Sequence, residues 1–198
     1  GEEDAHPEVP HVPDHVDSVA VGCVHSTMGQ PVDSSDVGSA VMVAPHRPGP
    51  RVFISYRRDD SAGHAGRLRD DLEDALGPGS VFHDVDSLAP GERFADSIRR
   101  CIEAADIVYV VIGRGWGDAR AHDGRRRLDD PDDVVRMEVA TALRSERRTA
   151  PVLVGGASMP TSDALPDVLA PLLDAHATEL RDSAWGADFD RLLRSSRL

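Results

Sequence analysis

Apolar residues occur along most of this chain in two patterns that take turns. Continuous runs rich in β-branched residues, typical of strands covered on both faces, lie at 52–54, 81–84, 106–112 and 150–154. Apolar residues three or four positions apart, which predict amphipathic helices, occur over 62–76, 92–104 and 131–143. Strands that alternate with helices favour a doubly wound α/β domain with a parallel sheet.

Turn and cap residues set the expected ends of these elements. Ser61 is expected to cap the first helix, and Gly77 to end it. Asp130 is expected to cap the helix that begins with Pro131. The remaining pattern predicts a short helix, an edge strand and a closing helix, at 163–173, 177–180 and 185–193.

The first 50 residues have a different composition from the rest. They hold seven of the 14 prolines, eight acidic residues against one arginine, and no Leu, Ile, Phe, Trp or Tyr. Such a segment cannot bury enough apolar surface to offset its ordering entropy. We therefore expect a disordered acidic tail or linker over 1–50 and one folded domain over 51–198. Since the chain begins with Gly1 rather than Met, it can be a fragment of a longer protein.

A metal site in this tail was considered and set aside. His11, His15, Cys23 and His25 are possible ligands, but Pro13 breaks the helix that ligands four residues apart need. We expect no metal in this protein.

Charge and residue usage exclude several classes of function. The formal net charge of −13 argues against nucleic acid or an anionic membrane as the main partner. All 22 basic residues are arginine, which excludes a response-regulator receiver because that fold needs a lysine after its last strands. Two cysteines, Cys23 and Cys101, favour a reducing cytosol, and Cys101 is expected to be a small core residue.

The segment that follows the first strand carries the candidate binding residues. Ligands of open α/β sheets bind where strands end and helices begin, which places Ser55, Tyr56, Arg57 and Arg58 to meet a substrate. The alternative is that the two arginines form only a solvated turn. Gly113 and Gly115 superficially resemble a dinucleotide-binding fingerprint, but no helix follows and the third glycine is misplaced.

Several motifs, in this order, resemble those of a bacterial TIR (Toll/interleukin-receptor) domain. They lie at 52–58, 82–86 before Pro90 and Gly91, 106–113, 129–138, 151–154 and 159–160. The resemblance covers about 51–198. It implies a flavodoxin-like three-layer fold with a five-stranded parallel sheet. It also implies self-association through the loop that contains Asp86, Pro90 and Gly91.

The resemblance further implies cleavage of NAD at the nicotinamide–ribose bond, with Glu138 as the catalytic residue. NAD is then the substrate, and no cofactor is expected. Arg57 or Arg58 would hold the pyrophosphate, and Phe53 or Trp116 would supply apolar contact. Where the family often has an aromatic residue, this sequence has Val134.

Two functions remain open at this point. The first is an NAD glycohydrolase of a bacterial signalling or antiphage defence system. The second is a non-catalytic interaction module that acts through homotypic contacts, in which Glu138 is only a surface charge in the first half of its helix. Incubation of the protein with NAD separates the two.

Overall fold

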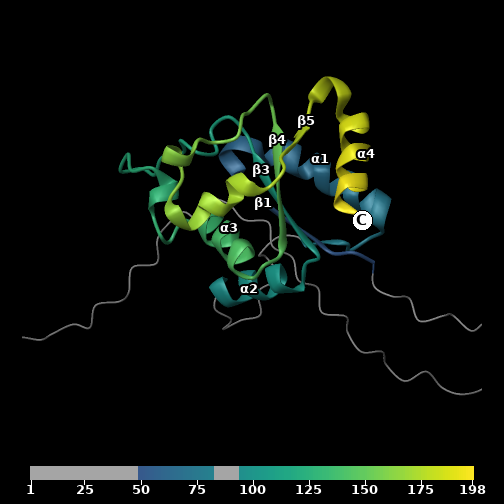
Figure 1. The fold of residues 1–198 in the computed structure, drawn as a ribbon, viewed down its shortest axis with the longest axis horizontal. Coiled ribbons are helices and arrows are strands. Elements are labelled where there is room, and N and C mark those ends of the chain that lie inside the picture. Colours follow the sequence, from purple (N-terminus) through teal and green to yellow (C-terminus); the bar gives the residue numbers. More distant parts are fainter. Residues whose placement is uncertain (1–48, 83–93) are drawn as a thin grey trace, which may run out of the picture.

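Five parallel strands form the centre of the domain, in the order β2-β1-β3-β4-β5. The computed structural model describes residues 49–82 and 94–198 (Figure 1). The strands are β1 (Val52–Tyr56), β2 (Val81–Phe82), β3 (Ile107–Ile112), β4 (Arg148–Val154) and β5 (Thr178–Leu180). This order is that of the flavodoxin-like folds, so the predicted fold class is confirmed.

The register of the sheet follows from the buried apolar runs. β1 pairs with β3 from Val52 opposite Ile107 to Tyr56 opposite Val111. β3 is the middle strand and is buried along its whole length, as its continuous apolar sequence predicts. The carboxyl ends of β1 and β3 therefore lie side by side.

Helices cover both faces of the sheet (Figure 1). Helices α1 (Arg58–Leu76) and α4 (Trp185–Ser196) pack on one face, through Leu68, Leu72, Phe189 and Leu192. Helices α2 (Phe94–Ala104) and α3 (Val134–Arg144) and the 3-10 helix η4 (Asp167–Asp174) cover the other face. Cys101 is fully buried on that second face, which confirms its core role.

Several element boundaries differ from the expected ones. Helix α1 begins at Arg58, but Ser61 has non-helical backbone angles and forms a kink, so the continuous part of the helix begins after Ser61, as expected. The Ser61 hydroxyl donates to the carbonyl of Arg57. The cap of α3 is Asp133 rather than Asp130, since the segment before it forms the 3-10 helix η2 (Arg127–Asp129) and a turn. The segment expected to be a helix at 163–173 forms two 3-10 helices, η3 (Ser162–Ala164) and η4. Pro166 ends the first, and Pro171 removes a backbone donor from the second.

Some expectations concern residues that the structure does not describe. The tail up to residue 48, with its histidines and Cys23, lies outside the described residues. The same holds for Asp86, Pro90 and Gly91 of the expected self-association loop. Within 49–82 and 94–198, no helix is long and apolar enough to cross a membrane. The short 3-10 helix η5 (Asp182–Ala184) completes the described elements.

Candidate active site

Glu138 and Ser55 form the centre of the candidate site. Ser55 is near the end of β1, and Glu138 is in the second turn of α3. The Ser55 hydroxyl donates a hydrogen bond of 2.7 Å to Oε2 of Glu138. Both side chains are fully buried, so the sequence interpretation of Glu138 as a surface charge is wrong. A catalytic role for Glu138 suggests that it lines an open cleft, but in this conformation it does not.

The environment of Glu138 favours its neutral form. Burial raises the pKa of Glu138 well above its usual range, and the nearby Asp133 raises it further. The hydrogen bond from Ser55 and the charge of Arg57 act in the opposite direction. Oε1 of Glu138 has no hydrogen-bond partner among the described residues. A buried carboxyl group with one oxygen unused is costly for folding, and it is a candidate for function.

A buried ion pair lies beside Glu138. The Arg57 guanidinium donates to both carboxylate oxygens of Asp133, at 3.0 and 3.1 Å. The two side chains are 0% and 2% exposed, so this bidentate pair is shielded from solvent. Arg57 Nε also donates to the carbonyl of Trp116, at 3.3 Å. Arg57 is thus held inside the protein and does not meet a substrate surface, contrary to expectation.

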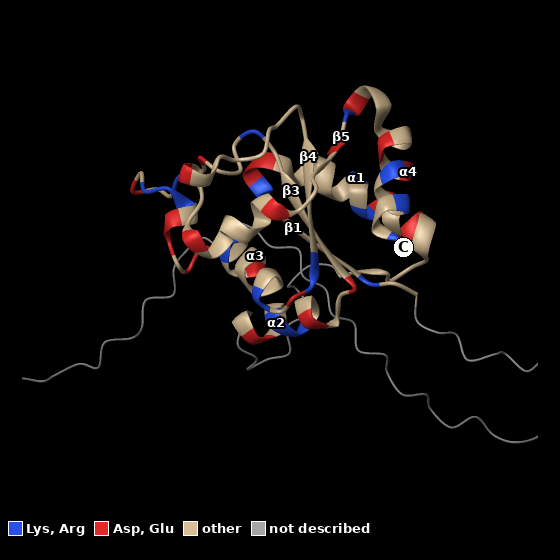
Figure 2. Cartoon of the chain, viewed as in Figure 1, with Lys and Arg blue, Asp and Glu red and all other residues tan. Residues whose placement is uncertain are grey.

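Asp133 accepts two further hydrogen bonds, one from α3 itself and one from the loop before it. Its carboxylate accepts the backbone N–H of Arg136, which caps α3, and the Nε of Arg127, at 3.0 and 3.2 Å. Acidic and basic residues gather in this segment between β3 and α3 (Figure 2). These contacts fix the start of α3, and hence the position of Glu138 on its second turn.

Asp60, in the first turn of α1, links this helix to the loop after β3. Its carboxylate accepts the backbone N–H groups of Gly113 and Gly115, at 2.9 and 2.7 Å. A Cβ atom at position 113 would collide with this carboxylate. The glycines therefore serve close approach of Asp60, and the likeness to a dinucleotide fingerprint has a structural cause.

The other expected contact residues lie in different surroundings. Phe53 and Trp116 are fully buried in the core on the α2 and α3 side, so neither presents a surface for substrate in this structure. Arg58 is exposed at the first position of α1. Tyr56 is half-buried on the opposite face of β1 from Ser55.

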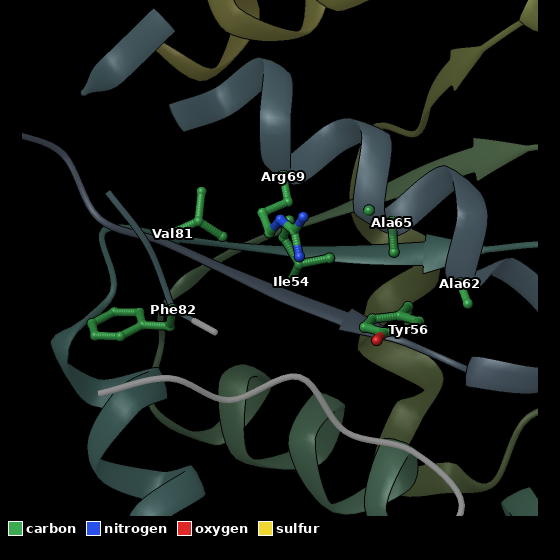
Figure 3. Close-up of a pocket in the computed structure, with 8 residues that line it drawn as sticks. Ile54, Tyr56, Ala62, Ala65, Arg69, Val81 and Phe82 are labelled. Atoms are coloured by element: carbon green, nitrogen blue, oxygen red, sulfur yellow. The ribbon is translucent and has the colours of Figure 1, made fainter. Parts of the chain in front are cut away.

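Tyr56 helps to line a pocket of about 130 Å³ between α1 and the strands β1 and β2 (Figure 3). Ile54, Ala65 and Arg69 lie around it, and Glu138 is not among its lining residues. Sites for drug-sized ligands occupy roughly 300 to 1,000 Å³, so this pocket is too small for a dinucleotide.

Sequence reasoning missed Asp133 and Asp60. Asp133 stands directly before the apolar pair Val134 and Val135, the usual position of a helix cap, and that signal could have identified it. Nothing in the local pattern of Asp60 indicates that it binds a loop 53 residues away. Among the described residues, no three His, Cys, Asp or Glu side chains are grouped to hold a metal ion.

The raised pKa of Glu138 predicts a pH-dependent contribution to stability. The folded protein keeps a proton on Glu138 at pH values where the unfolded chain, with a pKa near 4.5, has released it. The free energy of unfolding therefore falls as the pH rises from the unfolded pKa to the folded one. Glu138→Gln removes this titration, so the free energy of unfolding of the variant, minus that of wild type, should rise with pH. Between the unfolded and the folded pKa of Glu138, this difference should rise by up to about 1.4 kcal/mol per pH unit.

Urea denaturation of both proteins at a series of pH values measures this difference, because the other ionisable groups are common to both. Glu103→Gln, an exposed change on α2, controls for the loss of one carboxylate. A difference between wild type and Glu138→Gln that stays constant from pH 4 to 9 would contradict the assignment.

Comparison with known proteins gives a consistent result. Residues 52–193 match the family described as TIR domain. The chain is 28% identical over 146 residues, 74% of its length, to "NAD(+) hydrolase SARM1" of Danio rerio. It spans only 19% of the length of that relative.

The fold of this chain was also compared with solved structures. The TIR domains in the structure of the activated Roq1 resistosome, which recognises the pathogen effector XopQ, align with a TM-score of 0.54 and 14% identity. That alignment covers 74% of this chain and 98% of the other. A metazoan TIR-STING receptor from C. gigas, in complex with 2′,3′-cGAMP, aligns with a TM-score of 0.49 and 23% identity, over 73% and 38% of the two chains.

Proposed function

Since this chain belongs to the TIR domain family, we propose that it hydrolyses NAD at the nicotinamide–ribose bond, with Glu138 as the catalytic residue. The observation that carries the proposal is the position of Glu138. It is a buried carboxyl group, hydrogen-bonded to Ser55 near the carboxyl end of β1, with one oxygen unused among the described residues. The similarity to an NAD(+) hydrolase supports the same chemistry.

A single carboxylate suits this reaction. Ordinary glycosidases need an acid to protonate the leaving oxygen and a second carboxylate on the other side of the sugar. Nicotinamide leaves as a neutral molecule from a cationic pyridinium, so no acid is required. One anion that stabilises the oxocarbenium-like ribose is therefore sufficient for the departure of nicotinamide. A single water molecule then adds to the ribose carbon and gives up a proton, which the carboxylate of Glu138 can accept, so that the products are nicotinamide and ADP-ribose.

Glu138 must be ionised to act in this way. Burial holds it in the neutral form in the described conformation, and no surface of Glu138 is exposed to a substrate. Binding of NAD requires a local opening that exposes Oε1 of Glu138 while α3 keeps its register on β1, and this opening hydrates the carboxyl group. The positive charge of the pyridinium ring then lowers the pKa of Glu138 further, because an opposite charge nearby favours the ionised form.

The remaining contacts of the proposal come from the sequence resemblance. Arg58, exposed at the start of α1, is proposed to bind the pyrophosphate, since Arg57 is engaged by Asp133. Self-association is proposed to run through the loop with Asp86, Pro90 and Gly91. A bacterial signalling or antiphage defence system is proposed as the setting, in the cytoplasm, on the sequence resemblance alone.

The full burial of Glu138 favours a second candidate, the non-catalytic interaction module. Incubation of the full chain with NAD, at dilute and at high protein concentration, separates the two functions. We expect nicotinamide release, with a rate per molecule that rises with protein concentration because assembly promotes opening. Absence of release at every concentration would reject the hydrolase and leave the interaction module.

A further inference from the structure

The geometry points to Arg57 and Asp133 as positioning residues that hold the carboxyl group of Glu138 against Ser55. This role replaces the substrate contact that the sequence suggested for Arg57. The inference rests on the proposed function, because it assigns two further residues to the same site. It follows from two contacts between the end of β1 and the start of α3, Ser55 with Glu138 and Arg57 with Asp133.

Both junctions lie on the same side of the chain at the end of β1, where Arg57 directly follows the strand and is still extended. Ser55 and Arg57 are two residues apart, so their side chains leave the backbone on one side. Ser55 donates to Glu138, and Arg57 donates to Asp133. The two donors are separated by about 6.6 Å along an extended chain. Their acceptors are Asp133, the N-cap of α3, and Glu138, on its second turn.

Both junctions join the same two segments, and they form together in one register of α3 against β1. A shift of α3 by one residue along its axis, about 1.5 Å, would break at least one of them. The bidentate geometry of Arg57 on Asp133 fixes orientation as well as distance. The ion pair thus sets where the carboxyl group of Glu138 lies.

Arg57 and Asp133 leave little capacity for a ligand. Arg57 donates through all three of its side-chain nitrogens, to Asp133 and to the carbonyl of Trp116. Asp133 accepts from Arg57, Arg127 and the N–H of Arg136. A phosphate could bind Arg57 only after the buried pair had separated, which would leave the charge of Asp133 unpaired.

The decisive variant removes the pair without leaving a lone buried charge. Loss of either residue alone is expected to destabilise the fold strongly, since the other charge would stay buried. The double variant Arg57→Met, Asp133→Asn is neutral at both positions, and Asn keeps the cap of α3. We expect it to fold with the circular dichroism of wild type. We expect kcat for nicotinamide release to fall at least about 10-fold, with KM within about twofold, as for a lost transition-state contact.

A matched control exists elsewhere in the chain. Arg181 forms a similar bidentate pair with the buried Asp188 of α4. Arg181→Met, Asp188→Asn should leave kcat and KM unchanged. A raised KM with unchanged kcat in the Arg57 and Asp133 variant would overturn the inference in favour of a substrate contact. Unchanged kcat and KM would overturn it in favour of a purely structural pair.

A second measurement does not depend on activity. The titration of Glu138 can be followed by NMR with ¹³C-labelled glutamate and assigned from the signal that Glu138→Gln lacks. Ser55→Ala should raise the pKa of Glu138, because the hydrogen bond from Ser55 lowers it. Arg57 and Asp133 act on that pKa in opposite directions, and Asp133, which raises it, has the larger effect, so the loss of both charges does not by itself raise the pKa.

We expect the double variant to raise the pKa of Glu138 as Ser55→Ala does, because Ser55 and Glu138 lose their fixed register. A pKa of Glu138 that falls or stays unchanged in the double variant would overturn the positioning role. If wild type releases no nicotinamide, the proposed function fails while this titration still tests the inference.

Discussion

Glu138→Gln should lower the rate of nicotinamide release by about 100-fold or more. Glutamine keeps the shape of the side chain and can still accept the hydrogen bond from Ser55, but it carries no charge. If the carboxylate stabilises the ribosyl cation, its loss removes one preorganised electrostatic group, and losses of this kind cost about 10² to 10³ in kcat. The rate should be measured at saturating NAD, so that the chemical step rather than binding is compared.

Two controls accompany this variant. Glu103→Gln, on the exposed side of α2, should release nicotinamide at the wild-type rate. At neutral pH, Glu138→Gln should be at least as stable as wild type, because a buried ionisable group has been replaced by a neutral one. Equal release rates for wild type and Glu138→Gln would remove Glu138 from the mechanism.

Trp116→Ala should lower the free energy of unfolding by about 3 to 5 kcal/mol. The indole is fully buried in the core on the α3 side, next to the loop that Asp60 and Arg57 hold. Truncation to alanine leaves a cavity that the surrounding loop can fill only in part. Chemical denaturation of the two proteins measures the loss.

Trp116→Phe should change that free energy by less than about 1 kcal/mol. The indole N–H has no acceptor among the described residues, and an unsatisfied buried donor costs about 1 to 3 kcal/mol. Phenylalanine removes this donor while filling most of the same space. A core role therefore predicts that Trp116→Phe keeps wild-type KM for NAD. A raised KM with unchanged stability would restore Trp116 as a substrate contact.

The central strands could be predicted from the sequence because burial on both faces leaves a direct trace. Residues 52–54 and 107–112 are continuous apolar runs rich in β-branched side chains, which favours buried parallel strands. The succession of strands and helices then gave the doubly wound architecture. The end of α1 also followed from a local signal, because Gly77 adopts the positive φ that helix ends favour.

The burial of Glu138 could not be predicted from its own surroundings. A charged residue is expected at a surface, and its partner Ser55 lies 83 positions earlier in the chain. The engagement of Arg57 by Asp133 also depends on packing between distant segments. Adjacent arginines at 57 and 58 look alike in the sequence, yet one is buried and the other is exposed.

The five-stranded sheet separates Glu138 from the small pocket beside α1. Side chains on opposite faces of β1, such as Ser55 and Tyr56, therefore share few neighbours. Changes in free energy at sites without shared partners usually add. Stabilising substitutions on the α1 side can thus offset the cost of the buried carboxyl group of Glu138 without changing the register of α3. One face of the sheet supplies robustness to mutation, and the other is free to diversify in chemistry.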